Sequence, residues 1–489
     1  MVTRFHMHCI RIALWIGIAF LSPLIHAAEK PNVLFIIVDD LTANALSCYK
    51  SGTAITPSID RLAAQGTRYS RAYCQFPVCG PSRASLLSGY YPHGSGTMGY
   101  VSGRKEIGPN RSTWPQHFAK HGYHTARVSK IFHMGVPGEI ESGSDGADDP
   151  DSWHERFNSQ GPEWKAPGDS ELLENNRDGT KGVKGGNTLE LVKADGDDLV
   201  HSDGQTALKA CELLKKFKAD STKPFFLAVG FVRPHVPFVA PRSYYDAYPW
   251  DKVTLPEKVE GDWNDIPIAG INYKTSKNLD LDEDREKKAI AAYYASVAFM
   301  DAQVGKVLDA LAEEGLDQNT IVVFTSDHGF HLGEHLFWMK VSLMEESARV
   351  PLIIKVPGKQ PATCYCFAEL VDLYPTLCEL CGLPVPPMIQ GKSLAKTLDD
   401  PTHFVRDAAF CVNGMNSAFL LRTDRWAYIR HGRNGENGKQ LYDMESDPGQ
   451  YHNLAQSPES ASLLRELDEQ LDARLQEIEA SDIRRENRQ

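Results

Sequence analysis

The stretch Asn32-Val33-Leu34-Phe35-Ile36-Ile37-Val38-Asp39-Asp40 gives the strongest indication of the fold. Residues 33–38 are all apolar and mostly β-branched, a pattern typical of a short strand that is buried on both faces. Two carboxylates follow directly. In open α/β sheets the ligand crevice lies beyond the carboxyl ends of the strands. The stretch therefore predicts a central strand that delivers Asp39 and Asp40 to a functional site.

Three other apolar runs, residues 125–128, 225–231 and 321–325, also end in polar side chains. Those side chains are Lys130 and His133, Arg233 and His235, and Asp327 and His328. Helical patterns separate the runs, at residues 205–217 and 287–314, and the second carries apolar side chains at three- and four-residue spacing. This alternation predicts an α/β fold with a large, mostly parallel sheet flanked by helices. The order of the strands in the sheet is left open.

The rest of the chain divides by pattern. Residues 138–196 are rich in Gly, Asp, Ser and Glu and predict long surface loops that shape a substrate entrance. Alternating segments at 417–422 and 426–430 predict a small antiparallel sheet, and a charged helix with Leu464, Leu467, Leu471, Leu475 and Ile478 on one face follows. We expect a leader at residues 1–28, a main domain at 29–412 and a small α+β subdomain at 413–489.

The leader has the composition of a secretory signal peptide. Arg4 and Arg11 flank its start, residues 12–25 are apolar, and residues 27–28 are alanines. A transmembrane anchor is the alternative, but the apolar run is shorter than the roughly 20 residues that span a bilayer. We expect a mature chain that begins near Glu29, has no membrane span and is exported, to the periplasm or the medium, or to a lysosomal-type compartment in a eukaryote.

Charge and cysteine content limit the possible functions. The formal net charge of -12 disfavours a non-specific nucleic-acid binder, although cations that converge in one pocket would still bind an anionic ester. Export permits disulfides, whose pairing the sequence leaves open, among Cys48, Cys74, Cys211, Cys364, Cys366, Cys378, Cys381 and Cys411. The pairs Cys364–Cys366 and Cys378–Cys381 could suggest a zinc site, but residues 377–381 have a helical pattern, which favours buried thiols instead.

Asp39, Asp40, Asp327 and His328 form a candidate cation site. One Asp-Asp pair alone indicates a turn or cap, but two strand ends with carboxylates favour a divalent ion, which removes the repulsion between them. Carboxylate oxygens suit Ca²⁺ or Mg²⁺. The imidazole suits zinc or manganese, so the identity of the metal stays open.

The segment Cys79-Gly80-Pro81-Ser82-Arg83-Ala84-Ser85-Leu86-Leu87-Ser88-Gly89 predicts a short helix. Pro81 suits its first turn and Gly89 its end. Cys79 would then lie at the helix N-terminus, where backbone N–H groups favour an anion. On these grounds Cys79 is either an activated thiolate or a half-buried cysteine near a turn.

The segment from Cys79 to Gly89 resembles the signature of the type I sulfatase family, Cys-x-Pro-Ser-Arg followed by a helix that ends in Leu-Ser-Gly. Further motifs match in order, namely Asn32 to Asp40, Thr56-Pro57-Ser58-Ile59-Asp60, Thr325-Ser326-Asp327-His328-Gly329, Arg349-Val350-Pro351-Leu352 and Leu441 to Pro448. The resemblance covers nearly the whole chain after the leader and implies the alkaline-phosphatase-like sulfatase fold.

Other segments resemble the iduronate-2-sulfatase branch of that family. They are Lys130-Ile131-Phe132-His133, Arg233-Pro234-His235-Val236-Pro237-Phe238, and Gly333-Glu334-His335 through Trp338-Met339-Lys340. His328 stands where many sulfatases carry Asn. Gln450 departs from the acidic residue of many relatives, with little expected effect on catalysis.

The resemblance implies a mechanism. A separate maturation enzyme oxidises Cys79 to formylglycine, whose hydrate attacks sulfur, expels the alcohol and then eliminates sulfate. Asp39, Asp40, Asp327 and His328 would hold the cation together with the modified residue 79, Ca²⁺ by analogy. The carried-over catalytic roles are bracing by Arg83, charge neutralisation by Lys130 and Lys340, protonation of the leaving alcohol by His235 and proton removal by His133.

Each role has an alternative. Arg83 could form a plain structural salt bridge, either histidine could be a hydrogen-bonded core residue, and the two histidines could exchange roles. The expected substrate is a sulfated saccharide, with 2-O-sulfated uronic acid as the branch suggests. The rival functions are hydrolysis of phosphate or phosphonate esters on the same fold, and non-catalytic binding of sulfated glycans.

Overall fold

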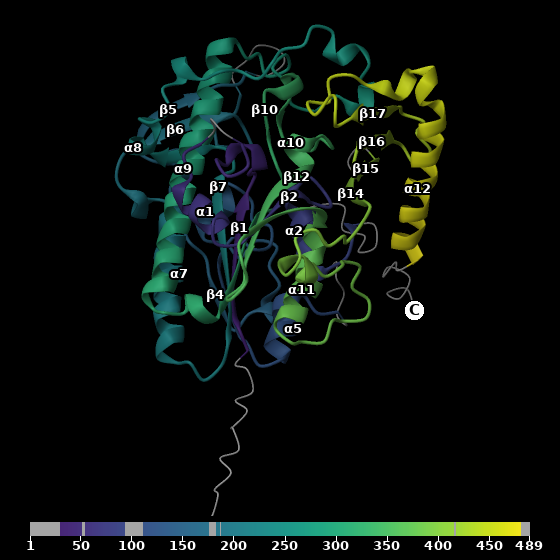
Figure 1. Cartoon of the computed structure of the whole chain (residues 1–489). Coiled ribbons are helices and arrows are strands. Elements are labelled where there is room, and N and C mark those ends of the chain that lie inside the picture. The colour runs from purple at the N-terminus through teal and green to yellow at the C-terminus, as the bar shows by residue number, and fades with distance from the viewer. Residues whose placement is uncertain are drawn as a thin grey trace, which may run out of the picture. The chain divides into compact units, whose positions relative to one another are not determined.

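The computed structural model describes residues 30–50, 54–92, 111–175, 182–185, 187–414 and 417–480 (Figure 1). The predicted signal peptide at residues 1–28 lies outside these ranges. No helix within them is long and apolar enough to cross a membrane.

An eight-stranded sheet forms the centre of the fold, in the order β13-β2-β12-β9-β1-β7-β3-β4. The four predicted strands correspond to β9, β1, β7 and β3, which are consecutive neighbours and run parallel. Only β12 is antiparallel to both of its neighbours, so the expectation of a mixed, mostly parallel sheet is confirmed. The bounds are β1 Asn32–Asp39, β2 Thr67–Tyr73, β3 His124–Ser129, β4 Glu155–Phe157, β7 Phe225–Pro234, β9 Thr320–Ser326, β12 Arg349–Lys355 and β13 Ala362–Glu369.

Helices cover both faces of this sheet (Figure 1). Because successive side chains of a strand point to opposite faces, β1 contributes Val33, Phe35 and Ile37 to one core and Leu34, Ile36 and Val38 to the other. The first core is covered by α2 Cys79–Ser88, α5 Trp114–Lys120 and α11 Leu373–Leu380. The second is covered by α1 Pro57–Ala63, α7 Ser202–Ala219 and α9 Glu283–Glu313. The apolar stripe predicted for α9 is buried there.

The segment 138–196 has more regular structure than the sequence indicated. It contains α6 Gly138–Ser142, β4, β5 Gly168–Leu172 and β6 Glu190–Ala194. β5 and β6 join β8 Phe238–Pro241 in a second, three-stranded sheet. Hydrophobic periodicity missed β5 because it is polar and partly exposed, and its pairing depends on residues distant in sequence. The prediction of loops was therefore wrong for these strands.

A four-stranded antiparallel sheet lies near the C-terminus, as predicted, with strands β14 Ala408–Asn413, β15 Ala418–Thr423, β16 Trp426–His431 and β17 Lys439–Asp443. Leu467, Leu471, Leu475 and Ile478 of α12 Ala461–Ala480 are buried against it. The sheet begins before the predicted boundary at residue 413, and the Val412 N–H donates to the Gln75 carbonyl at 3.0 Å. The division into domains 29–412 and 413–489 stays a prediction.

Short elements complete the described chain. They are α8 Arg242–Tyr245, α10 Glu345–Ala348, and the paired strands β10 His331–Leu332 and β11 Trp338–Met339. Lys340 follows β11 directly, so this pair of strands delivers a cation to the edge at which β1 and β9 end.

Candidate active site

The carboxyl ends of β1 and β9 place their aspartates side by side. The Asp40 N–H donates to Asp327 Oδ1 at 3.3 Å, and both side chains are fully buried. Asp40 has a φ of 64°, in the left-handed region that is unfavourable for a residue other than glycine. The Tyr293 hydroxyl of α9 donates to the Asp40 carbonyl at 2.8 Å and accepts from the Thr42 N–H at 3.0 Å. These bonds stabilise the turn that aims the Asp40 carboxylate.

Helix α2 begins at Cys79, and Gly89 caps its C-terminal end in the left-handed conformation, as the sequence predicted. Cys79 Sγ lies 3.2 Å from His328 Nε2, 3.2 Å from Lys340 Nζ and 3.8 Å from Asp40 Oδ1. Burial and the Asp39 carboxylate raise the pKa of the Cys79 thiol, but Lys340 and His328 outweigh them and the pKa is lowered. Residue 79 therefore lies among the strand-end groups rather than in the hydrocarbon core.

The polar atoms around Cys79 form two overlapping sets of candidate metal ligands. Asp39, Cys79, Asp327 and His328 offer atoms that all lie within 4.8 Å of one another, and so do Asp40, Cys79 and His235. Burial raises the pKa of Asp40 to about 6, although Lys340 opposes the shift. These buried carboxylates fit an oxygen-preferring divalent cation.

His328 is surrounded by acidic groups. Burial lowers its pKa, but Asp327, Cys79 and Asp40 raise it to about 10. A protonated imidazole cannot ligate a metal through the nitrogen that carries the proton. A cation among the carboxylates would compete with this proton, since both neutralise the same negative charges.

Arg83 is fully buried and connects four segments of the chain. Its Nε donates to Asp327 Oδ2 at 2.8 Å and its Nη2 to Asp39 Oδ1 at 3.3 Å. Its Nη1 donates to the carbonyls of Lys130 and Ile131 at 2.6 and 3.1 Å. Lys130 Nζ is paired in turn with Asp39 Oδ2. Arg83 thus orients the aspartates at the ends of β1 and β9 and the loop after β3.

The two predicted catalytic histidines both have lowered pKa values. His235 Nδ1 donates to the Val236 carbonyl at 2.5 Å, so its Nε2 lone pair accepts from Lys340 Nζ at 3.1 Å. Burial and Lys340 lower the pKa of His235 well below its ordinary value. Burial and Lys130 lower the pKa of His133 to about 3. Both rings are therefore able to accept a proton.

Arg233 has a different environment from the other strand-end cations. Its guanidinium pairs with Glu163 and donates to the carbonyls of His235 and Pro237. It therefore supports the loop that carries His235 and does not join the groups around Cys79. Sequence reasoning also missed Tyr293, because its place on the apolar stripe of α9 indicated only core packing.

Replacement of Arg83 by Met should lower the free energy of unfolding by about 3–5 kcal/mol, because it removes the guanidinium partner of buried Asp327 and leaves buried Asp39 with Lys130 alone. Urea denaturation of the metal-free protein measures this loss. Arg61→Met is the matched control, since Arg61 forms an ion pair with Asp309 that is about half exposed, 48% and 55% for the two side chains. The control should change stability by about 0.5 kcal/mol or less. Equal effects of the two substitutions would contradict the bracing role.

Comparisons with known proteins agree with this geometry. A family model described as Sulfatase matches residues 31–383, and one described as N-sulphoglucosamine sulphohydrolase, C-terminal, matches residues 333–477. A sulfatase from Formosa agariphila is 33% identical over 444 residues, which cover 87% of this chain and 83% of the relative. Iduronate 2-sulfatase from Mus musculus is also 33% identical, over 470 residues that cover 87% and 77% of the two chains.

The solved structures show the same fold. The phosphonate monoester hydrolase SpPMH from Silicibacter pomeroyi superposes with a TM-score of 0.73 at 22% identity and covers 91% of this chain and 95% of its own. The architecture is the alkaline-phosphatase-like fold that the sequence implied. By its family match and its curated relatives, this chain is a sulfuric ester hydrolase that belongs to the sulfatase family.

Proposed function

We propose that this protein removes sulfate from a sulfated saccharide, with a formylglycine made from Cys79 and a divalent cation, Ca²⁺, in the active site. The observation that carries the proposal is the position of Cys79 Sγ, 3.2 Å from both His328 Nε2 and Lys340 Nζ. A nucleophile at this position is adjacent both to candidate metal ligands and to a cation able to contact a sulfate oxygen.

Asp39, Asp40, Asp327 and His328 are the proposed metal ligands. Three of the four are carboxylates, which supports Ca²⁺ over softer ions. When bound, the cation supplies a positive charge that stabilises an oxygen nucleophile and the charge on sulfate. Arg83 and Lys130 keep Asp39 ionised, because their charges outweigh burial and hold its pKa well below the ordinary value.

A separate maturation enzyme is the proposed source of the formylglycine. The hydrated aldehyde carries two hydroxyl groups, of which one attacks sulfur and the other loses the proton that allows sulfate to leave. A cysteine or serine has a single nucleophilic group and lacks this second step. The buried position of residue 79 excludes bulk water from the reaction.

Lys340 and Lys130 are proposed to neutralise sulfate oxygens as their charge increases. His133 is proposed to accept the hydroxyl proton, and its lowered pKa keeps it neutral for this task. His235 is proposed to protonate the leaving alcohol. It must take up a proton from solvent for this role, since Lys340, 3.1 Å away, needs its own proton to keep its positive charge.

We propose a saccharide with a 2-O-sulfated uronic acid as the substrate. Support comes from the 33% identity to mouse iduronate 2-sulfatase over most of both chains, and from the segments around His133, His235 and Lys340 that resemble that branch. The proposed compartment is outside the cytoplasm, in keeping with the leader composition of residues 1–28.

Cys79→Ala should abolish release of sulfate from an aryl sulfate while the thermal unfolding temperature stays close to that of the parent. Peptide mass spectrometry of the active parent protein should show formylglycine at position 79. Cys211→Ala, at a partly exposed cysteine on α7, is the control that retains turnover. Full activity of Cys79→Ala, or an unmodified cysteine in fully active enzyme, would require another nucleophile.

Added Ca²⁺ should raise the unfolding temperature of the chelator-treated protein. At a Ca²⁺ concentration of about one hundred times Kd, the free energy of unfolding should increase by about 2.7 kcal/mol. Asp327→Asn should lose most of this increase because it removes one charge from the ligand set. Asp301→Asn, at a buried carboxylate that accepts from the N–H groups of Ser58 and Ile59, is the matched control and should respond like the parent. An undiminished response of Asp327→Asn would disprove the assigned site.

The rival function is hydrolysis of phosphate or phosphonate monoesters, which the likeness in fold to SpPMH keeps open. We expect kcat/KM for 4-nitrophenyl sulfate to exceed that for 4-nitrophenyl phosphate and phenylphosphonate esters. Faster turnover of either phosphorus ester would favour the rival. Binding of sulfated glycans without any sulfate release would favour the non-catalytic alternative.

A further inference from the structure

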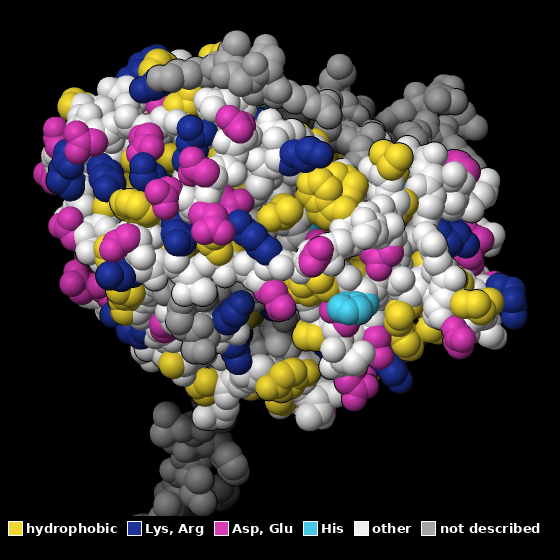
Figure 2. All heavy atoms as spheres, turned by 90° about the horizontal axis from the view of Figure 1, so that it is seen from above, with side chains coloured by type: hydrophobic (Ala, Val, Ile, Leu, Met, Phe, Trp, Pro, Cys, Tyr) yellow, Lys and Arg dark blue, Asp and Glu magenta, His cyan; other side chains and the backbone are white. Residues whose placement is uncertain are grey.

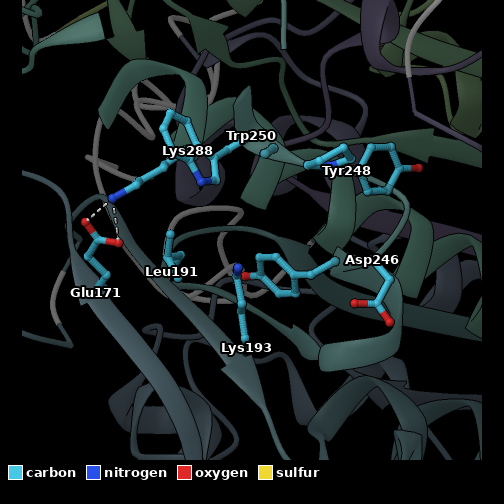
Figure 3. A pocket seen from close by; sticks show the side chains of 10 residues that line it. Glu171, Leu191, Lys193, Asp246, Tyr248, Trp250 and Lys288 are labelled. Atoms are coloured by element: carbon cyan, nitrogen blue, oxygen red, sulfur yellow. Dashed lines mark hydrogen bonds and ion pairs between the residues drawn. The ribbon is translucent and has the colours of Figure 1, made fainter. Parts of the chain in front are cut away.

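A second pocket lies beside α9, apart from the groups around Cys79. It has a volume of about 450 Å³, within the usual range of ligand sites. Leu191 and Lys193 of β6 and Glu171 of β5 contribute to its lining, and Lys288 contributes from α9. The segment after α8 adds Tyr248 and Trp250 (Figure 3).

The pocket and the active site contact different sides of α9. Lys288 and Ala291, three residues apart, line the pocket. Tyr293, roughly half a turn beyond Ala291, donates its hydroxyl proton to the Asp40 carbonyl. The two sites therefore lie on different sides of the same helix.

The aromatic side chains of the pocket are held in place by contacts outside it. The Tyr248 hydroxyl accepts from the Ile55 N–H at 2.8 Å, and its ring lies 6.0 Å from that of Tyr294. Trp250 packs against Lys288, whose Nζ is 5.5 Å from the indole. Both rings are partly exposed, so they offer pre-ordered apolar surface. The C–H face of a pyranose ring packs on surfaces of this kind.

The charged side chains of the pocket differ in their pairing. Lys288 Nζ is paired with Glu171 Oε1 at 2.8 Å (Figure 3). Lys193 contacts the ring of Tyr245 at 5.5 Å, and Asp169, opposite it on β5, pairs instead with Arg242 at 2.6 Å. Asp169 attracts Lys193 without forming a close ion pair with it, so the Lys193 ammonium is able to bind an anionic group. Asp246, on the other side of the pocket, is able to accept hydrogen bonds from hydroxyl groups (Figure 3).

The face of the protein that is seen from above does not form a broad basic surface that would attract an anionic chain. Figure 2 shows basic and acidic side chains interspersed on the face seen from above, in keeping with the net charge of -12. Attraction of a polyanion to this face therefore depends on particular sites rather than on a broad basic surface.

We propose that this pocket is a second binding site for a sulfated saccharide chain, in which Trp250 and Tyr248 pack against a sugar ring and Lys193 binds a sulfate group. The inference rests on the proposed function, since it gives the sulfated saccharide substrate a second binding site outside the catalytic centre. The site adds no chemical step. It raises the local concentration of the chain near Cys79.

Electrophoresis in gels that contain heparin, a sulfated uronic-acid polysaccharide, tests the proposal directly. Lys193→Ala should weaken retardation about threefold, and Trp250→Ala about tenfold. Trp250→Phe should restore most of the binding because it keeps an aromatic face. Lys252→Ala is the matched control, since it removes the same charge from an exposed lysine nearby that does not line the pocket.

Turnover separates the second site from the catalytic one. In Lys193→Ala and Trp250→Ala, kcat/KM for desulfation of heparin oligosaccharides should fall, while hydrolysis of 4-nitrophenyl sulfate stays unchanged. Retardation is also measured in Cys79→Ala protein, so the binding result stands whether or not the saccharide is a substrate. Unchanged retardation of the Lys193→Ala/Trp250→Ala double variant would overturn the proposal, as would an equal loss in Lys252→Ala.

Discussion

The buried guanidinium of Arg83 is the interaction on which the catalytic geometry depends. It contacts the aspartates at the ends of β1 and β9 and the carbonyls that follow β3, so one side chain from α2 connects three strands of the central sheet. Because Arg83 is one helical turn from Cys79, the same contacts set the position of the proposed nucleophile relative to the candidate metal ligands. A lysine would not replace it, since only the planar guanidinium donates in several fixed directions at once.

Charge balance explains how an acidic protein can hold an anionic ester. Three buried aspartates, Asp39, Asp40 and Asp327, lie among three buried cations, Arg83, Lys130 and Lys340. A divalent cation that displaces the proton of His328 would add positive charge to this group, which an anionic sulfate ester would compensate. Affinity for sulfate would thus increase when the metal is bound, and it would not depend on the net charge of the surface.

Much of this arrangement could be predicted from local sequence. Residues 33–38 and 321–325 are apolar runs with polar ends, which is sufficient to identify two of the parallel strands and their functional edge. The signature at Cys79 gave the start and end of α2.

Two kinds of feature were not predictable. Tyr293 has no signal that separates it from core residues, because its hydroxyl partner comes from a distant strand. β5 and β6 depend on pairing with β8, and polar, partly exposed strands lack the periodicity that local patterns require.

Helix α9 has a mechanical consequence for the choice of substrate. Its 31 residues are packed against the second core through Val297, Met300 and Val304, so the helix behaves as a rigid spacer. Lys288, near one end of the helix, lines the second pocket, and Tyr293 supports the turn at Asp40. The helix therefore lies between the two sites. If the second pocket binds the saccharide as proposed, a saccharide too short to reach from one site to the other would gain nothing from it, and the enzyme would distinguish substrates by their length.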